Sequence, residues 1–200
     1  LSPWLMAAVQ ALMGAGLLAI WAANLLTVLI SWAIYDLVQA AAYLASGISP
    51  RTVVRSLVLG SLATVFLWSG AVLSDGGTGG ALWALTTPGS PTVTLWAFAG
   101  ILRLGMYPFH LAVPDEPGRA PSLAFPLSLG PVLGWGLVLR IALVNGGPVP
   151  GRPWVLILGA INLGMGGFMA WCCEQPQRRI VRVGMGVAGA IMLAAGLAGE

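Results

Sequence analysis

The sequence predicts an all-α fold, a polytopic bundle of about seven transmembrane helices that forms one domain over residues 1–200. Hydrophobic residues make up 58% of the chain and charged residues only 8%, whereas a soluble domain carries about 25% charged residues. Charges are also widely spaced, since Asp36 is the only one before Arg51. Each membrane crossing needs about 20 apolar residues, so a chain of this length has room for about seven.

Hydropathy and turn-forming residues divide the chain into spans with short connections. Clusters such as Asn145-Gly146-Gly147 close several spans because these residues favour turns. A Gly-, Thr- and Pro-containing stretch at 76–91 is too broken for a span, and we expect it at the membrane interface. The predicted spans are 4–21, 24–46, 52–74, 92–113, 120–145, 153–173 and 179–198.

The arginines are distributed unevenly between the two sides of this layout. One side carries only Arg152 in its connections, and the other carries Arg51, Arg119, Arg178, Arg179 and Arg182. An excess of arginine marks the cytoplasmic side of a membrane protein. We therefore expect a multi-pass protein of the cytoplasmic (inner) membrane with its N-terminus in the cytoplasm.

Four ionisable residues fall inside predicted spans and away from the span ends, namely Asp36, Arg103, His110 and Arg140. A charge at the centre of a span costs at least about 2.5 kcal/mol on insertion scales, so such residues face a partner or a hydrated path. Two interpretations stay open: a buried pair that fixes helix packing, or part of a transport path. Pro108 lacks an N–H and breaks a helix. We expect the fourth span to be discontinuous near Pro108, with His110 facing the bundle two turns from Arg103 on the same face.

The sequence shows no sign of a catalytic or cofactor-binding protein. It has no nucleophile–base pair, no phosphate loop, no dinucleotide fingerprint and no soluble domain. The adjacent Cys172 and Cys173 match no zinc or iron–sulfur spacing. We expect no cofactor, no metal, no nucleic-acid partner and no catalysis by this chain alone. Whether it is a subunit of an enzyme stays open.

Residues 102–115, with the sequence LRLGMYPFHLAVPD, resemble a signature of the antiporter-like subunits of respiratory complex I (NADH-quinone oxidoreductase) and of Mrp-type cation/proton antiporters. The family pattern is roughly F-K-x-x-x-x-P-F-H-x-W-x-P-D. This chain keeps the Pro-Phe-His, the Pro-Asp and the later Ala-Pro at 120–121. Residues 24–44, Arg140 and residues 177–181 also match family segments, in the family's order.

The resemblance implies that the seven spans correspond to the family's fourth to tenth helices, in a bundle of inverted repeats around a polar axis. It implies translocation of protons, or of a cation in exchange for protons, within a larger assembly. Asp36, Arg103, His110 and Arg140 would then form a proton path. The implied partners are other membrane subunits and lipid, and contact with quinone is left open.

The chain also departs from the family pattern. The family's Glu after Trp is Ala33 here, and the nearest acid is Asp36, one helical turn later. The Lys of the broken helix is Arg103, and the Lys expected near Pro131 is absent. Arginine keeps its proton at any working pH and is a poor relay. The alternative is therefore a degenerate structural subunit of a respiratory or photosynthetic complex that has lost pumping. Under both interpretations we predict that Asp36 and Arg103 lie close enough to interact.

Overall fold

The computed structural model of the chain describes residues 3–74, 90–112, 129–145 and 152–197. Over these residues it confirms the predicted all-α fold with seven α-helices, and the described part contains no β-strand. The helices are α1 (Pro3–Trp21), α2 (Leu25–Ala45), α3 (Pro50–Ser74), α4 (Ser90–Arg103), the short 3-10 helix η2 (Phe109–Ala112), α6 (Leu129–Asn145), α7 (Arg152–Trp171) and α8 (Pro176–Leu197).

Ordinary start and stop signals set several of these boundaries. Asn24 has an extended backbone, and its side chain accepts a hydrogen bond from the Thr27 N–H at 2.8 Å, which caps α2. Gly47 follows the end of α2 with a φ of 81°, a left-handed conformation that glycine adopts easily. Pro50 and Pro176 begin α3 and α8, where the missing N–H of proline costs nothing.

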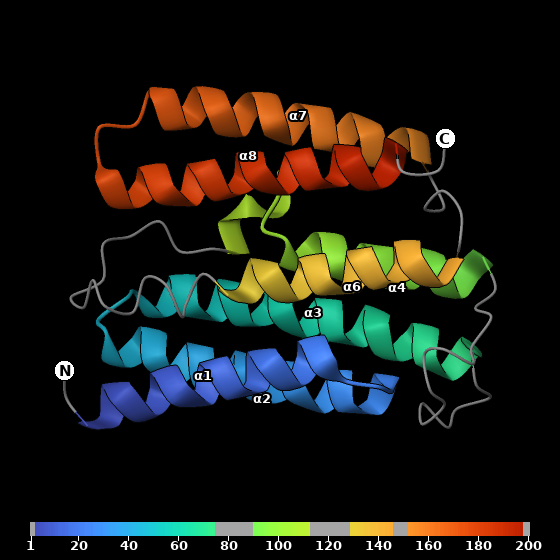
Figure 1. Cartoon of the computed structure of the whole chain (residues 1–200). Helices are drawn as coiled ribbons and strands as arrows, with labels where there is room; N and C mark the ends of the chain where they lie inside the picture. Colours follow the sequence, from blue (N-terminus) through green and yellow to red (C-terminus); the bar gives the residue numbers. More distant parts are fainter. Residues whose placement is uncertain (1–2, 75–89, 113–128, 146–151, 198–200) are drawn as a thin grey trace.

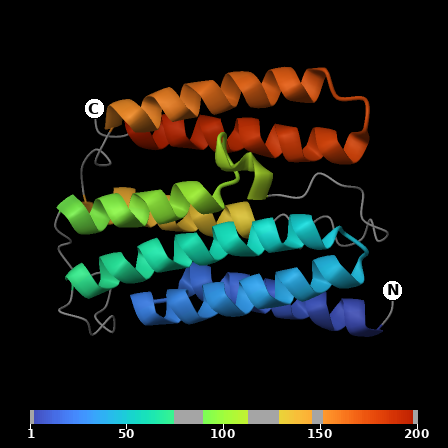
Figure 2. The ribbon, with the colours of Figure 1, turned by 180° about the vertical axis from the view of Figure 1, so that it is seen from behind.

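The helices run side by side and form three groups (Figure 1). Helices α1, α2 and α3 lie at one side, α4 and α6 lie in the middle, and the hairpin of α7 and α8 lies at the other side. Figure 2 shows the same order from behind. The middle group connects the outer two, because α4 packs on α3 while α6 contacts α1, α4 and α8.

Five of the predicted spans match these helices closely, and the fourth helix is shorter than expected. Helix α4 ends at Arg103 rather than near 113, because the chain turns at Leu104 and Gly105. The fifth predicted span began at 120, whereas α6 begins at Leu129, and 120–128 lie outside the described residues. Most of the predicted interfacial stretch 76–91 also lies outside them, and its last two residues begin α4.

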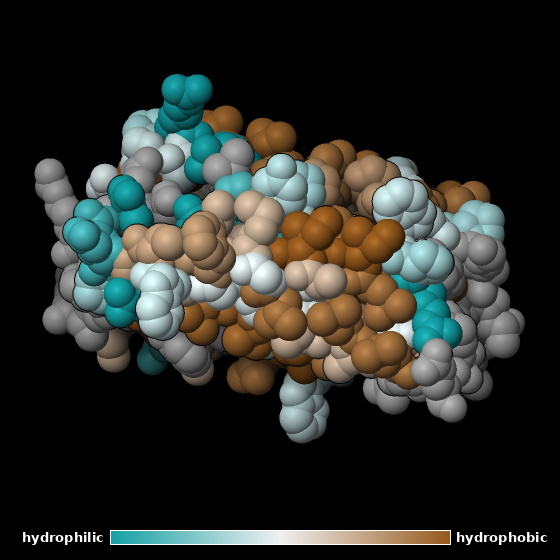
Figure 3. Space-filling view, turned by 90° about the horizontal axis from the view of Figure 1, so that it is seen from above, coloured by the Kyte–Doolittle hydropathy of each residue, from teal (hydrophilic) through white to brown (hydrophobic). Residues whose placement is uncertain are grey.

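The chain is a multi-pass membrane protein. Four described helices are long and apolar enough to cross a membrane: α2, α3, α7 and the Arg178–Leu197 part of α8. Two shorter apolar helices, Met6–Trp21 and Gly130–Ala142, accompany them. Large apolar side chains lie on the outside, and Phe168 on α7 is 70% exposed. In Figure 3, brown hydrophobic residues cover much of the middle of the visible face and teal residues gather toward its left end.

The arginine-bearing connections lie together. The α2–α3 and α7–α8 turns both lie at the left end in Figure 1, whereas α7 begins at the right end. Arg51 belongs to the first turn of α3, Arg178 and Arg179 to the first turn of α8, and Arg152 to the start of α7. Arg119 lies outside the described residues. This arrangement agrees with the predicted bias, and the cytoplasmic position of the N-terminus stays a prediction.

Two hydrophobic cores hold the described helices together. The larger lies among α1, α2, α3, α4 and α6 and contains the big side chains Trp32, Tyr35, Leu67 and Trp96. The smaller lies where α4 and α6 meet the α7–α8 hairpin and includes Met106, which is completely buried. The functional candidates lie at and between these two cores.

Candidate functional site

Asp36 and Arg103 form a buried, two-pronged ion pair between α2 and the last residue of α4. Arg103 Nη1 donates to Asp36 Oδ1 at 2.8 Å, and Nη2 donates to Oδ2 at 2.7 Å. The two residues are each only 7% exposed. The planar guanidinium matches a carboxylate in this geometry, which gives a strong and directional contact. The predicted interaction of Asp36 with Arg103 is therefore present in the structure.

The surroundings of the pair hold it in place from two further sides. The Arg103 guanidinium carbon lies 4.2 Å from the centre of the Trp32 ring, a cation–π contact. Gly60 of α3 presses against the other partner, since a Cβ built there would lie 2.9 Å from both carboxylate oxygens of Asp36. Any residue larger than glycine at position 60 would displace the carboxylate. Gly60 could not be predicted as part of the site from the sequence, because glycine carries no chemical signal of its own.

The predicted interruption of the fourth span is present and begins directly after Arg103. The Leu104 N–H still donates to the Gly100 carbonyl at 3.0 Å. Gly105 then turns the chain with a φ of 64°, the Tyr107–Pro108 peptide bond is cis, and η2 begins at Phe109. Broken helices inside a membrane are tolerated where protein surrounds them. Here the pair-forming arginine stands at the edge of the break.

His110 lies in η2, beyond the turn, with its imidazole stacked on Tyr107 at 5.7 Å between ring centroids. It is half-buried, its Nδ1 atom is buried, and η2 packs against α3. His110 therefore faces the bundle as predicted. The expectation that it continues the face of Arg103 by two helical turns is wrong, because α4 ends at Arg103 and residues 104–108 are not helical.

Asn162 of α7 holds the broken segment and was not among the residues predicted from the sequence. Its Oδ1 accepts from the Tyr107 N–H at 2.5 Å, and its Nδ2 donates to the Tyr107 carbonyl at 3.3 Å and to the Leu158 carbonyl at 2.8 Å. Asn162 is completely buried. The available signal was a polar amide inside an otherwise apolar span, where such a group needs partners.

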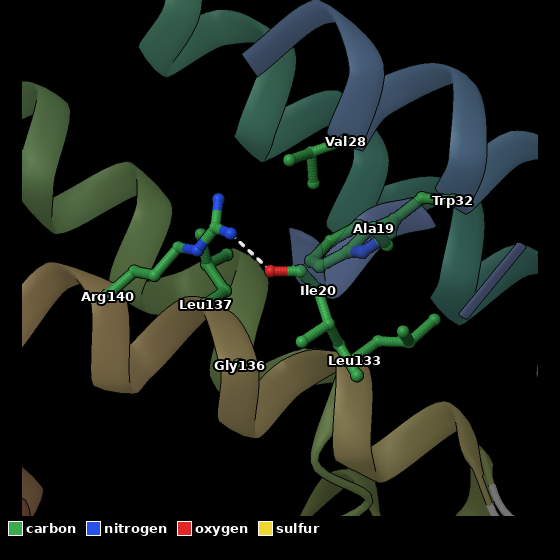
Figure 4. Close-up of a pocket in the computed structure, with 8 residues that line it drawn as sticks. All are labelled: Ala19, Ile20, Val28, Trp32, Leu133, Gly136, Leu137 and Arg140. Carbon is green, nitrogen blue, oxygen red and sulfur yellow. Dashed lines mark hydrogen bonds between the residues drawn. The ribbon is translucent and has the colours of Figure 1, made fainter. Parts of the chain in front are cut away.

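Arg140 of α6 binds the end of α1 and does not touch Asp36. Its two terminal nitrogens donate to the carbonyls of Ile20 and Ala22, and Figure 4 shows the contact with Ile20. These carbonyls belong to the last turn of α1 and to the residue after it, so the cation lies at the negative end of the helix dipole. The structure therefore separates Arg140 from the ion pair, although the sequence placed both in one path.

A small cavity lies between Arg140 and Trp32. Its volume is about 10 Å³, and residues of α1, α2 and α6 line it (Figure 4). A cavity of this size holds about one water molecule. Trp32 borders it and also stacks on Arg103, so this indole lies between the two arginines. In the part of the chain that the structure describes, no group of three His, Cys, Asp or Glu side chains is placed to bind a metal.

Comparison with known proteins identifies several relatives of this chain. No family model matches it. It is 31% identical over 167 residues to the NADH-quinone oxidoreductase subunit N of Xanthomonas euvesicatoria, which covers 72% of this chain and 34% of the relative. It is 30% identical over 108 residues to the NAD(P)H-quinone oxidoreductase chain 4-2 of a Synechocystis strain, which covers 50% of this chain and 19% of the relative.

A third relative, the NAD(P)H-quinone oxidoreductase chain 4 3 of a Picosynechococcus strain, is 30% identical over 95 residues, which covers 43% of this chain and 17% of the relative. The chain thus spans about a third or less of the length of these relatives. All three are named as parts of NADH- or NAD(P)H-quinone oxidoreductases. The chain is therefore a divergent relative of complex I subunits, in agreement with the resemblance of its Pro-Phe-His segment to the antiporter-like family.

Proposed function

We propose that this chain takes part in proton translocation as a membrane subunit of an NADH-quinone oxidoreductase-like assembly. The observation that carries the proposal is the Asp36–Arg103 ion pair, buried beside the break in the fourth span. The relatives named above are subunits of NADH- or NAD(P)H-quinone oxidoreductases, which supports the same kind of assembly for this chain. The chain is not catalytic alone, and the redox chemistry would belong to other subunits.

The chemistry of the pair assigns different roles to its two members. Arginine is a poor proton relay, so Arg103 serves as a fixed positive charge rather than as a proton carrier. The Asp36 carboxylate can take up a proton, and protonation would remove the charge that Arg103 binds. A proton that arrives at Asp36 therefore weakens the pair, and its departure restores it. His110 would extend the path beyond the break, and Arg140 would contribute a second fixed charge.

The other members of the assembly are part of the same proposal. The partners are further membrane subunits, with lipid around the exposed apolar faces, and contact with quinone is left open. The membrane is the cytoplasmic (inner) membrane. The N-terminus lies in the cytoplasm, on the side of the arginine-bearing α2–α3 and α7–α8 turns, because cytoplasmic connections are enriched in arginine.

Charge-neutral variants of the pair test the proposal. Each substitution is made in the full-length protein, and the intact assembly is then purified and reconstituted in liposomes. Single D36N and R103Q variants each leave an uncompensated buried group and should lower the amount of assembled complex. The double variant D36N/R103Q removes both charges and should assemble. We expect it to lose NADH-driven proton uptake while it keeps quinone reduction. R51Q, at an exposed arginine, is the matched control.

The second candidate function is a structural subunit that no longer pumps. This alternative is favoured by Arg103, which stands where the family has lysine, since arginine is a poor proton relay. Proton uptake at the parent level in the D36N/R103Q complex would establish this alternative. A parent complex that moves no protons at all would do the same.

A further inference from the structure

Asn162 uses its side chain to replace backbone hydrogen bonds that the broken helix has lost. Its amide pairs with both the N–H and the carbonyl of one residue, Tyr107, at 2.5 and 3.3 Å. Two contacts to one residue fix that residue in position and in rotation about the contact. Without them, two backbone polar groups at membrane depth would need other partners, at a cost of several kcal/mol.

The backbone of Asn162 is itself held firmly from behind. Gly189 of α8 lies so close that a Cβ there would be 2.9 Å from the Asn162 carbonyl carbon and closer still to the Leu163 nitrogen. Asn162 therefore belongs to the α7–α8 hairpin as a rigid part, with its amide extended toward the break. The second hydrogen bond from Nδ2, to the Leu158 carbonyl, restrains the side chain within α7.

Tyr107 stands four residues after Arg103, and the turn at Gly105 lies between them. The end of α4 is thus restrained at two places, by Asp36 through Arg103 and by Asn162 through Tyr107. Leu104 and Met106, which belong to the smaller hydrophobic core, also pack against α7 and α8 beside Tyr107. A displacement of the hairpin therefore moves Tyr107, and with it the segment that ends at Arg103.

We propose that Asn162 is a positioning residue that couples the α7–α8 hairpin to the Asp36–Arg103 pair through the broken segment. This inference rests on the proposed function, since the pair is taken as the charged element of proton transfer. Asn162 carries no proton itself. It sets where the end of α4 stands, and so how firmly Arg103 is held on the Asp36 carboxylate when the rest of the assembly moves the hairpin.

The test uses N162L in the reconstituted complex, which keeps the number and branching of the side-chain heavy atoms and removes all the hydrogen bonds of the side chain. Its control is L163A, at the neighbouring position, where the side chain is 44% exposed. We expect N162L to accelerate amide exchange at Tyr107 about tenfold or more, because a buried hydrogen bond is lost. Exchange at Leu104 should rise with it, proton uptake should fall severalfold, and L163A should change none of these values.

N162D provides a second variant in case N162L does not assemble. A carboxylate can accept from the Tyr107 N–H but cannot donate to its carbonyl, whereas a protonated carboxyl can do both. Proton uptake by N162D, relative to the parent at the same pH, should therefore rise as the pH is lowered. A pH profile parallel to that of the parent would overturn the inference.

The outcomes separate this inference from the proposed function. Full proton uptake in N162L, together with fast exchange at Tyr107, would show that Asn162 only satisfies the backbone of the break, and would leave the ion pair untouched. Fast exchange at Tyr107 with unchanged exchange at Leu104 would also overturn the coupling, even in a complex that moves no protons. Loss of proton uptake in D36N/R103Q but not in N162L would keep the proposed function and refute the inference.

Discussion

Two regions of the molecule differ in how their helices are held together: the bundle around α2, α3 and α4, and the hairpin of α7 and α8. In the bundle, helices are held by large side chains and by a charge pair, with Trp32, Trp96 and the Asp36–Arg103 contact at the centre. In the hairpin, the two backbones approach each other directly. A Cβ at Gly166 would lie 2.7 Å from the Cα of Gly186, which leaves no space for a side chain.

The difference follows from what each region has to bury. In lipid there is little hydrophobic force between helices, so association depends on close packing and on polar contacts. The hairpin meets that condition with a stripe of small residues at Gly159, Gly166 and Ala170, and Asn162 is the one polar member. The bundle buries two charged side chains, Asp36 and Arg103, which must be paired before its helices can pack. We therefore expect the bundle to respond most to changes of charge and the hairpin most to changes of volume.

The largest effect is expected when the charge pair is broken from one side. R103Q leaves the Asp36 carboxylate buried without its partner and should lower the free energy of unfolding by about 3–5 kcal/mol. D36N/R103Q should recover most of that loss, because both charges are gone. Thermal unfolding in detergent micelles, followed by circular dichroism, measures both variants. A double variant no more stable than R103Q would show that the bundle depends on shape rather than on charge.

In the hairpin, adding one methyl group should be more damaging than its size suggests. G166A places a Cβ against the backbone of Gly186, which cannot move aside as a side chain can, and we expect a loss of about 3 kcal/mol. G164A, two residues away, is the control, because a methyl group added there would meet nothing within 4 Å. It should be neutral or stabilising by up to about 1 kcal/mol, because alanine favours a helix. Equal unfolding temperatures for the two variants would remove the distinction between the regions.

Gly60 is one place where the bundle, like the hairpin, has no room for a larger residue. G60A would push on both carboxylate oxygens of Asp36, and we expect a loss of about 1–2 kcal/mol together with weaker proton uptake. G14A on α1, where nothing lies within 4 Å, is the control. Infrared spectra of the Asp36 carboxylate stretch, identified by its absence in D36N, should shift in G60A. An unshifted band would mean that the pair adapts to the added methyl group.

The smallest effect is expected at Arg140, which stabilises a helix end rather than a partner charge. R140Q should cost about 0.5–2 kcal/mol, because the carbonyls of Ile20 and Ala22 lose a cation at the negative end of α1. R51Q, at an exposed position in the first turn of α3, should cost nothing, since a cation is unfavourable at the positive end of a helix. A loss in R140Q as large as that in R103Q would place Arg140 in the charged core after all.

Much of this architecture could be predicted from the sequence because membrane burial makes polar residues informative. The high cost of a lone charge in lipid predicted the Asp36–Arg103 pair, and the missing backbone N–H of proline predicted the break near Pro108. Asn162 and Gly60 were not predicted, because an amide or a glycine acquires its role only from the helix that lies opposite. The early end of α4 depends on Gly105, whose left-handed turn does not follow from the residue type alone.

The separation of the two charges along the chain has a consequence for biosynthesis. Asp36 leaves the ribosome 67 residues before Arg103, so α2 reaches the membrane while its acid still lacks a partner. An aspartate at mid-helix opposes insertion by about 2.5–3.5 kcal/mol, whereas each Leu, Ile or Val favours it by about 0.3–0.6 kcal/mol. The nine such residues of α2 together favour insertion by about 2.7–5.4 kcal/mol, which is comparable to the cost of the acid. The strongly apolar composition of α2 therefore offsets the unpaired charge until α4 brings Arg103 to it.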